Sequence, residues 1–144
     1  MSLEALRKFR AQEREALMVE LAHVSRELMS LEQRCGTLEE RMRIDASLAQ
    51  RQAVQGTTAH TWLEWDEQLA SQWLLLKQVR EAVRRLTDVW GKTRARLIEA
   101  MQEGKVLDRL EGRRQAEREA LMRKQEQRAS DEMASRQLFL NKRS

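Results

Sequence analysis

The stretch LMVELAHVSRELMSLEQRCGTLEERM, residues 17–42, places an apolar residue or cysteine at alternating steps of four and three without interruption. This spacing is a 3.5-residue repeat, which is typical of a helix packed along one seam against another helix. The seam positions of the stretch are Leu17, Leu21, Val24, Leu28, Leu31, Cys35, Leu38 and Met42. The repeat is broken at Arg10 and Arg14 and fades after Met42. It predicts a first helix over about residues 2–54.

The segment QGTTAHT, residues 55–61, is the clearest break in the chain, because it groups one glycine with three threonines and has no heptad. Thr61 is followed three residues later by Glu64, which is the spacing of a capping box at the start of a helix. The sequence therefore predicts a turn over about residues 55–60 and a second helix over about residues 61–140.

A second seam follows the turn as two seven-residue ladders. One ladder consists of Trp62, Leu69, Leu76, Val83, Trp90 and Leu97, and the other of Trp65, Gln72, Val79, Leu86, Thr93, Ala100 and Leu107. Two seams on either side of a short turn predict an all-α fold, a single long antiparallel two-helix coiled-coil hairpin over residues 1–144. Trp62, Trp65 and Trp90 are interpreted as seam residues, whereas Trp73, Leu74 and Leu75 lie off the ladder, and mark either a partner site or a locally wider core.

Composition supports a helical protein: the chain has no proline, five glycines and 35% charged residues. Its net charge of +4 is confined to residues 112–144, which hold nine basic and five acidic residues. With the turn near residue 57, Leu3 lies opposite residue 111, so that residues 112–144 have no helix to pair with in the chain. We expect this segment to form a basic overhang that is marginal as an isolated helix.

Catalytic and membrane-spanning classes are disfavoured. His23 and His60 are far apart in sequence, and the single cysteine, Cys35, lies in the seam, so that no metal site or Cys–His nucleophile has a recognised spacing. No phosphate-binding loop is present, and we expect no enzyme activity and no cofactor. The chain has no apolar run long enough to span a membrane and no secretory signal, which predicts a cytoplasmic protein.

The stretch RRQAEREALMRKQEQR, residues 113–128, is the only candidate for nucleic-acid binding. Glutamates at positions 117, 119 and 126 interrupt its basic residues and would repel phosphates. Nucleic-acid binding is therefore the third hypothesis. A generic coiled-coil adapter or homo-oligomer, using the same seams between chains, is the second.

Two longer stretches resemble the FliJ family of flagellar export proteins: GTTAHTWLEWDEQLASQ, residues 56–72, and KVLDRLEGRRQAEREALMRKQEQRASDEMASRQ, residues 105–137. The resemblance covers about residues 3–137. It implies a non-enzymatic stalk, similar in shape to the coiled-coil gamma subunit of rotary ATPases. The end that carries both termini would enter the hexameric ring of the export ATPase FliI. The hairpin would contact the export gate FlhA and escort some substrate chaperones, at the cytoplasmic side of the inner-membrane export apparatus.

The resemblance also implies particular contact residues. Those for the export ATPase are Arg113, Arg114, Arg118, Arg123, Asp131 and Glu132, and those for the export gate are Gln68, Gln72, Leu75 and Val79. Injectisome stalk proteins have the same hairpin architecture and are homologues of the FliJ family, so the resemblance extends to them. On this reading the free chain is a monomeric hairpin.

Overall fold

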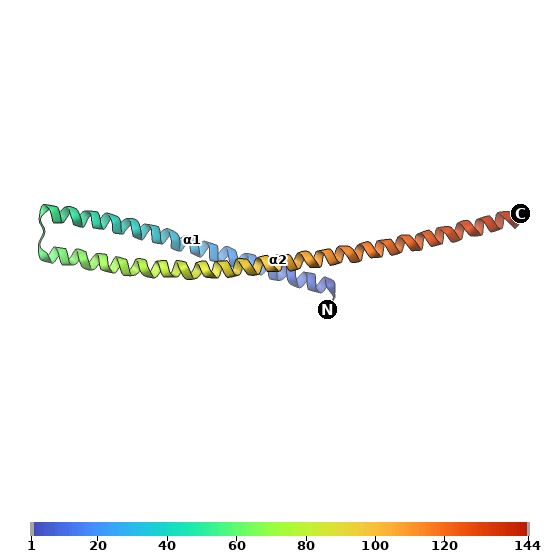
Figure 1. The fold of residues 1–144 in the computed structure, drawn as a ribbon, viewed down its shortest axis with the longest axis horizontal. Helices are drawn as coiled ribbons and strands as arrows, with labels where there is room; N and C mark the ends of the chain where they lie inside the picture. The colour runs from blue at the N-terminus through green and yellow to red at the C-terminus, as the bar shows by residue number, and fades with distance from the viewer. Residues whose placement is uncertain (1, 144) are drawn as a thin grey trace. The chain divides into compact units, whose positions relative to one another are not determined.

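The computed structural model describes residues 2–143, which form two α-helices. Helix α1 spans Leu3–Gln55, helix α2 spans Ala59–Arg143, and residues 56–58 join them (Figure 1). No strand occurs between residues 2 and 143. The prediction of an all-α two-helix coiled-coil hairpin is confirmed, and both helix starts and ends lie within three residues of their predicted positions.

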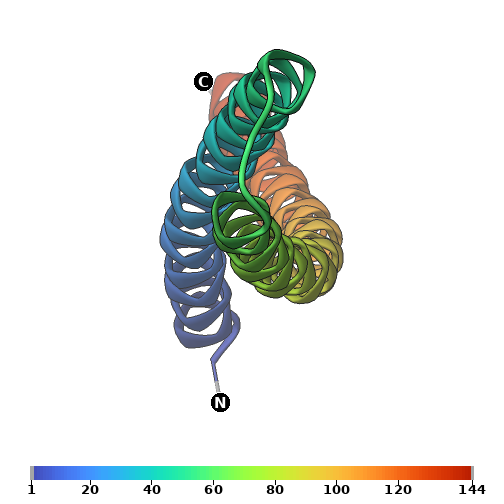
Figure 2. The ribbon, with the colours of Figure 1, turned by 90° about the vertical axis from the view of Figure 1, so that its left-hand side faces the viewer.

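The chain divides into two compact units, which are described separately. Residues 14–98 form one unit, and residues 2–13 with 99–143 belong to the other. Within the 14–98 unit, α1 and α2 lie side by side and run antiparallel on either side of the turn (Figures 1 and 2).

The core of the 14–98 unit is the seam between the two helices. Its buried residues are Val24 and Ala49 of α1 and Leu76, Val79 and Thr93 of α2. The half-buried seam residues are Leu17, Leu21, Leu28, Leu31, Cys35, Leu38 and Met42 on α1, and Trp65, Leu69, Val83, Leu86, Trp90 and Leu97 on α2. Since each helix is apolar along one stripe only, neither can bury that stripe without the other.

In the unit that contains residues 2–13, Ala100 and Leu107 of α2 are buried. Arg10 occupies a seam position of α1 and is half-buried. Its guanidinium forms ion pairs with Glu103 of α2 (2.8 Å) and Glu13 of α1 (2.9 Å). An arginine is tolerated there because its aliphatic stem can pack along apolar surface while the charged end reaches acidic partners at the edge. Arg7 pairs with Asp108 (2.9 Å) nearby.

The turn is closed by Gly56 and Thr58. Gly56 has φ 92°, a left-handed conformation that glycine adopts without a Cβ clash, and its N–H donates to the Ala53 carbonyl (3.4 Å). The Thr61 N–H donates to Thr58 Oγ1 (3.2 Å), so Thr58 is the N-cap of α2. This corrects the prediction of Thr61 as the cap. The Thr-x-x-Glu pattern misplaced the cap, because α2 already begins at Ala59, so that Thr58 precedes its first turn and Thr61 lies within that turn.

Trp62 departs from its predicted seam position, since the structure leaves it 53% exposed. Helix α1 ends at Gln55, and each of residues 51–60 is exposed, so the end of α1 leaves more than half of Trp62 uncovered. Trp65 is the first tryptophan to enter the seam, where its Nε1 donates to Gln52 Oε1 (2.7 Å). The seam therefore begins one ladder position later than the sequence predicted.

Replacing Thr58 by alanine should lower the free energy of unfolding by about 1 kcal/mol, because an N-cap hydroxyl satisfies an otherwise unpaired amide. Urea unfolding followed by circular dichroism measures the loss. The matched variant T61A should cost less, and an equal or larger loss for T61A would contradict the assignment of the cap.

Leu76 and Leu74 are two residues apart on α2 but differ in burial, at 2% and 61% exposure. The L76A variant should lose about 2–5 kcal/mol of stability, because it leaves a cavity in the seam. The L74A variant should lose less than about 0.5 kcal/mol, as is usual for surface substitutions. Thermal and urea unfolding at low protein concentration measure the stability of the two variants. Similar losses of stability would contradict the assignment of Leu76 to the seam and of Leu74 to the surface.

Candidate partner-binding surfaces

The C-terminal part of α2 carries the first candidate surface, which we call the basic overhang, residues 112–143. Glu111 is the last half-buried residue, and every residue from Gly112 to Arg143 is exposed. Helix α2 has 85 residues and α1 has 53, so α1 is too short to cover all of α2. The helix continues through Gly112 without a break.

The seam pattern itself changes at the overhang. The four-and-three spacing that places Leu107 and Glu111 in the seam continues through Arg114, Arg118 and Leu121. Charged side chains replace apolar ones at the first two of these positions, Arg114 and Arg118, so another helix would find no continuous apolar stripe there. The overhang is suited to a partner that offers charged groups as well as apolar contacts.

The predicted export-ATPase contacts all lie on the overhang, and all are exposed: Arg113, Arg114, Arg118, Arg123, Asp131 and Glu132. They do not form one cluster. A helix turns by about 100° per residue, so Arg113 and Arg114 point in different directions, and Asp131 lies about 27 Å along the axis from Arg113. The structure distributes these charges around the helix and along it.

The predicted export-gate contacts lie beside the seam of the 14–98 unit. Gln68 is exposed, Gln72 and Leu75 are half-buried, and Val79 is buried at 5% exposure. Gln68 and Gln72 both donate through Nε2 to Asp45 Oδ2 of α1, at 3.3 and 2.6 Å. Gln68 and the exposed part of Leu75 are accessible to another protein, whereas Val79 and Gln72, whose Oε1 is buried, hold the hairpin together.

Asp45 extends the seam of α1 beyond the point at which the sequence pattern fades. The spacing that ends at Met42 continues to Asp45 and Ala49, and both are covered by α2. Extending the four-and-three spacing beyond Met42 would have predicted Asp45 as a seam residue. The sequence pattern missed it because it was based on apolar positions and Asp45 is charged. Gln72 Oε1 is buried and has no hydrogen-bond partner, so this polar layer is incompletely satisfied.

A second surface, which we call the outer apolar face, lies on α2 outside the seam. It comprises Trp62, Leu63, Ala70, Trp73 and Leu74. The four large residues are 53–61% exposed. All five fall within about 120° around the helix axis, so they form one stripe. Sequence reasoning singled out Trp73 and Leu74 but placed Trp62 in the seam, and Leu75, which it grouped with them, is half-buried against the hairpin.

Basic residues border the outer apolar face on its C-terminal side. Trp73 and Leu74 line a shallow groove with Lys77, Arg80 and Arg84. The Arg80 guanidinium lies 5.8 Å from the centre of the Trp73 ring, within cation–π range.

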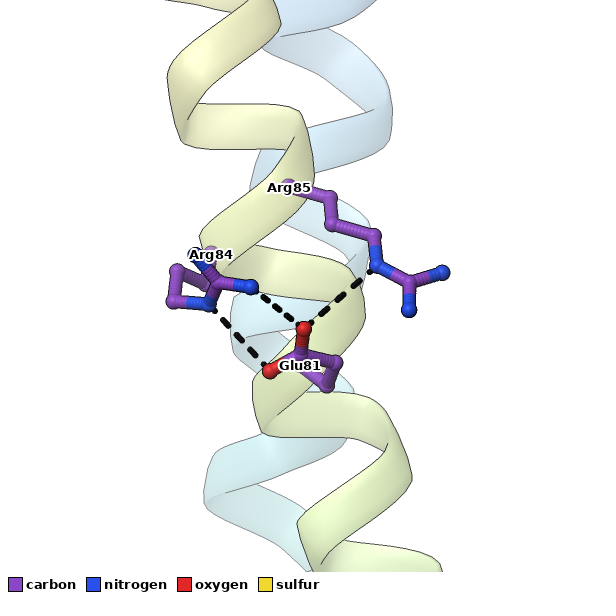
Figure 3. A network of polar contacts seen from close by, with 3 residues as sticks. All are labelled: Glu81, Arg84 and Arg85. Carbon is purple, nitrogen blue, oxygen red and sulfur yellow. Dashed lines mark hydrogen bonds and ion pairs between the residues drawn. The ribbon is translucent and has the colours of Figure 1, made fainter.

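A carboxylate organises the far end of this groove. Glu81 accepts hydrogen bonds from Arg84 Nε (3.2 Å) and Nη2 (2.5 Å), and Arg85 Nε lies 3.5 Å from Glu81 Oε1 (Figure 3). These arginines, Arg84 foremost, lower the pKa of the Glu81 carboxyl. The ionised Glu81 thus pairs with both arginines, of which Arg84 lines the groove.

Arg80 also links the two helices. It donates to Glu39 Oε1 of α1 (3.1 Å), and the Cys35 thiol donates to the same oxygen (3.4 Å). Hydrogen bonding from Arg80, followed by that from Cys35, lowers the pKa of Glu39. Burial and the neighbouring Glu39 raise the pKa of the Cys35 thiol, which favours the protonated form that donates.

A family model described as Flagellar FliJ protein matches residues 1–143. The chain belongs to this family. Neither the curated proteins nor the solved structures compared with the chain include a match. FliJ-family membership makes the chain a component of the flagellar export apparatus, in a family of structural and chaperone-type proteins.

The described part of the FliJ-family chain has neither a membrane-spanning helix nor a cluster of metal-ligating side chains. No helix within residues 2–143 is long and apolar enough to cross a membrane. Over the same residues, no three His, Cys, Asp or Glu side chains gather as a metal site.

The Glu39–Arg80 pair gives this FliJ-family hairpin a pH dependence. Because the fold lowers the pKa of Glu39, its contribution to stability is present above the ordinary glutamate pKa of about 4.3 and is lost as the pH falls through the lower folded-state value. The E39Q variant should therefore melt slightly below the wild type at neutral pH, with the gap closing below about pH 4. Thermal melts across pH measure the gap. The control is E32Q, since Glu32 is exposed on the same helix and has no ion pair in the described chain; an equal pH trend in both variants would contradict the assignment.

Proposed function

We propose that this chain is the non-enzymatic stalk of the flagellar export apparatus. Its end with both termini binds the FliI-like export ATPase ring, and its hairpin links that ring to the FlhA-like export gate. Substrate chaperones are further partners, and the protein works at the cytoplasmic side of the inner membrane. The observation that carries the proposal is the basic overhang, 32 residues of helix without a covering helix in its own chain.

The overhang needs a partner for a physical reason. A helix in water without tertiary packing is marginally stable, because little offsets the entropy of ordering the chain. At about 1.5 Å per residue, residues 112–143 extend for about 48 Å, which is long enough to pass into the centre of a protein ring. Arg113, Arg114, Arg118 and Arg123 would meet acidic groups of the ring, and Asp131 and Glu132 would meet basic ones.

The distribution of these charges suits a ring better than a flat surface. They point in several directions around the helix, so a partner that surrounds the helix can engage all of them. Because the helix is not rotationally symmetric, each ring subunit meets a different set of charges. Such contacts bias the conformations of successive subunits if they differ in strength between the subunit states.

The gate contact is proposed at the accessible members of the predicted set, Gln68 and Leu75. Gln72 and Val79 position them: Gln72 shares Asp45 with Gln68, and Val79 anchors α2 one turn beyond Leu75. In this arrangement, the export gate binds the side of the hairpin, and the export ATPase ring binds the overhang.

Removal of residues 112–144 should abolish stimulation of the cognate export ATPase by the purified chain, because the ring contact is deleted. ATP hydrolysis by the ATPase alone, with the full chain and with the truncated chain measures the effect. Circular dichroism of the truncated chain verifies that the hairpin remains folded. If the truncated chain stimulates as well as the full chain, the overhang is not the ring contact.

A charge-reversal pair refines this experiment. The R114E/R118E variant should raise the concentration for half-maximal stimulation by about tenfold or more, as expected for the loss of about 1.4 kcal/mol or more of binding energy. The control R34E/R41E reverses two exposed arginines of α1 and should leave stimulation unchanged.

A further inference from the structure

The centre of the outer apolar face, Trp73 and Leu74, lies between two groups of opposite charge along α2. Glu64, Asp66 and Glu67 precede its centre along α2 and carry a charge of −3. Residues 77–85 follow it with four basic residues and one acid, a net charge of +3. The midpoint between the acidic group and the basic residues falls at Trp73 and Leu74, the most exposed side chains of the face apart from Leu63.

This arrangement is self-complementary. From this pattern we infer that the outer apolar face binds a second copy of the chain, packed antiparallel about a two-fold axis at Trp73 and Leu74. The free chain then associates reversibly as its concentration rises, in contrast to the monomeric hairpin that the family resemblance implies. Each copy would then place its acidic group against the basic group of the other, and the apolar centres would cover one another. An isologous two-fold contact requires such a match of a patch with itself. The inference does not depend on the proposed function.

Three charged residues close to the apolar centre have no partner among residues 2–143. Within the described residues, neither Asp66, Glu67 nor Lys77 forms an ion pair or side-chain hydrogen bond. Under two-fold pairing, the second copy's Asp66 and Glu67 come level with residues 81 and 80, between Lys77 and Arg84. These basic residues lie about 5–6 Å along the axis from that level, which their side chains can bridge.

The one acidic residue within the basic group does not prevent the charge pairing between the two copies. Glu81 is the only acidic residue of the basic group, and Arg84 and Arg85 already neutralise it (Figure 3). Arg80 is held by Glu39, so Lys77 is the basic residue most available to the second copy. Both hairpins stay intact, since the face shares no buried residue with the seam.

Sedimentation equilibrium of the full chain over a concentration series tests the inference. The average mass should rise from one chain toward two as concentration increases, and added salt should weaken the association by screening the charge pairs. A chain that stays monomeric at every concentration would overturn the proposal, and the face would then fit a helix of a different protein.

Truncation of the apolar centre locates the contact. The W73A/L74A variant should associate at least about tenfold more weakly, as is usual when central apolar anchors are lost. The matched control L121A/M122A removes two side chains of similar exposure, 59% each, from the overhang and should associate like the wild type. Association of W73A/L74A at wild-type strength would show that another surface is used.

A charge-exchange experiment tests the antiparallel arrangement. The D66K/E67K variant is basic at both ends of the face, and K77E/R84E is acidic at both ends, so each alone should be monomeric. An equimolar mixture should restore association, because every end then meets its opposite. Circular dichroism verifies that both variants are folded, and failure of the mixture to associate would contradict the two-fold charge pairing.

Discussion

Burial of the apolar stripe between α1 and α2 is the interaction on which the rest of the structure depends. Leu76, Val79 and Val24 lose nearly all contact with water only because the other helix covers them. Residues 2–143 have no buried apolar residue outside this seam that could compensate if it opens. Every other feature, including the turn, the polar cross-links and the exposed faces, is positioned by the register that this packing sets.

Polar contacts across the seam refine that register. An apolar stripe tolerates slippage by one heptad, whereas paired polar groups match at one offset only. The Trp90 indole donates to Ser25 Oγ (3.0 Å), Gln72 donates to Asp45, and Trp65 donates to Gln52. These hydrogen bonds occur at three levels along the hairpin. A shift of α2 along α1 would break all three, so together they favour a single register.

The difference in helix length leaves part of α2 outside this packing. Because α1 ends its coverage of α2 near Glu111, a basic helix is left without an internal partner, and the family is one whose members serve flagellar protein export. The outer apolar face arises differently. It consists of residues at helical spacing that the two-helix seam has no room to bury. Both surfaces are therefore consequences of a fold with a single narrow interface.

The sequence by itself determined the helical class, the position of the turn, most seam residues and the lack of a covering helix for the overhang, because a 3.5-residue repeat and a glycine-centred break are local properties. Only the tertiary structure decided which threonine caps α2, that Trp62 remains exposed, and that Asp45 belongs to the seam. These depend on where α1 ends relative to α2 and on which polar groups meet across it. The same reason separates accessible Gln68 from buried Val79, since one helix's spacing does not reveal what the other helix covers.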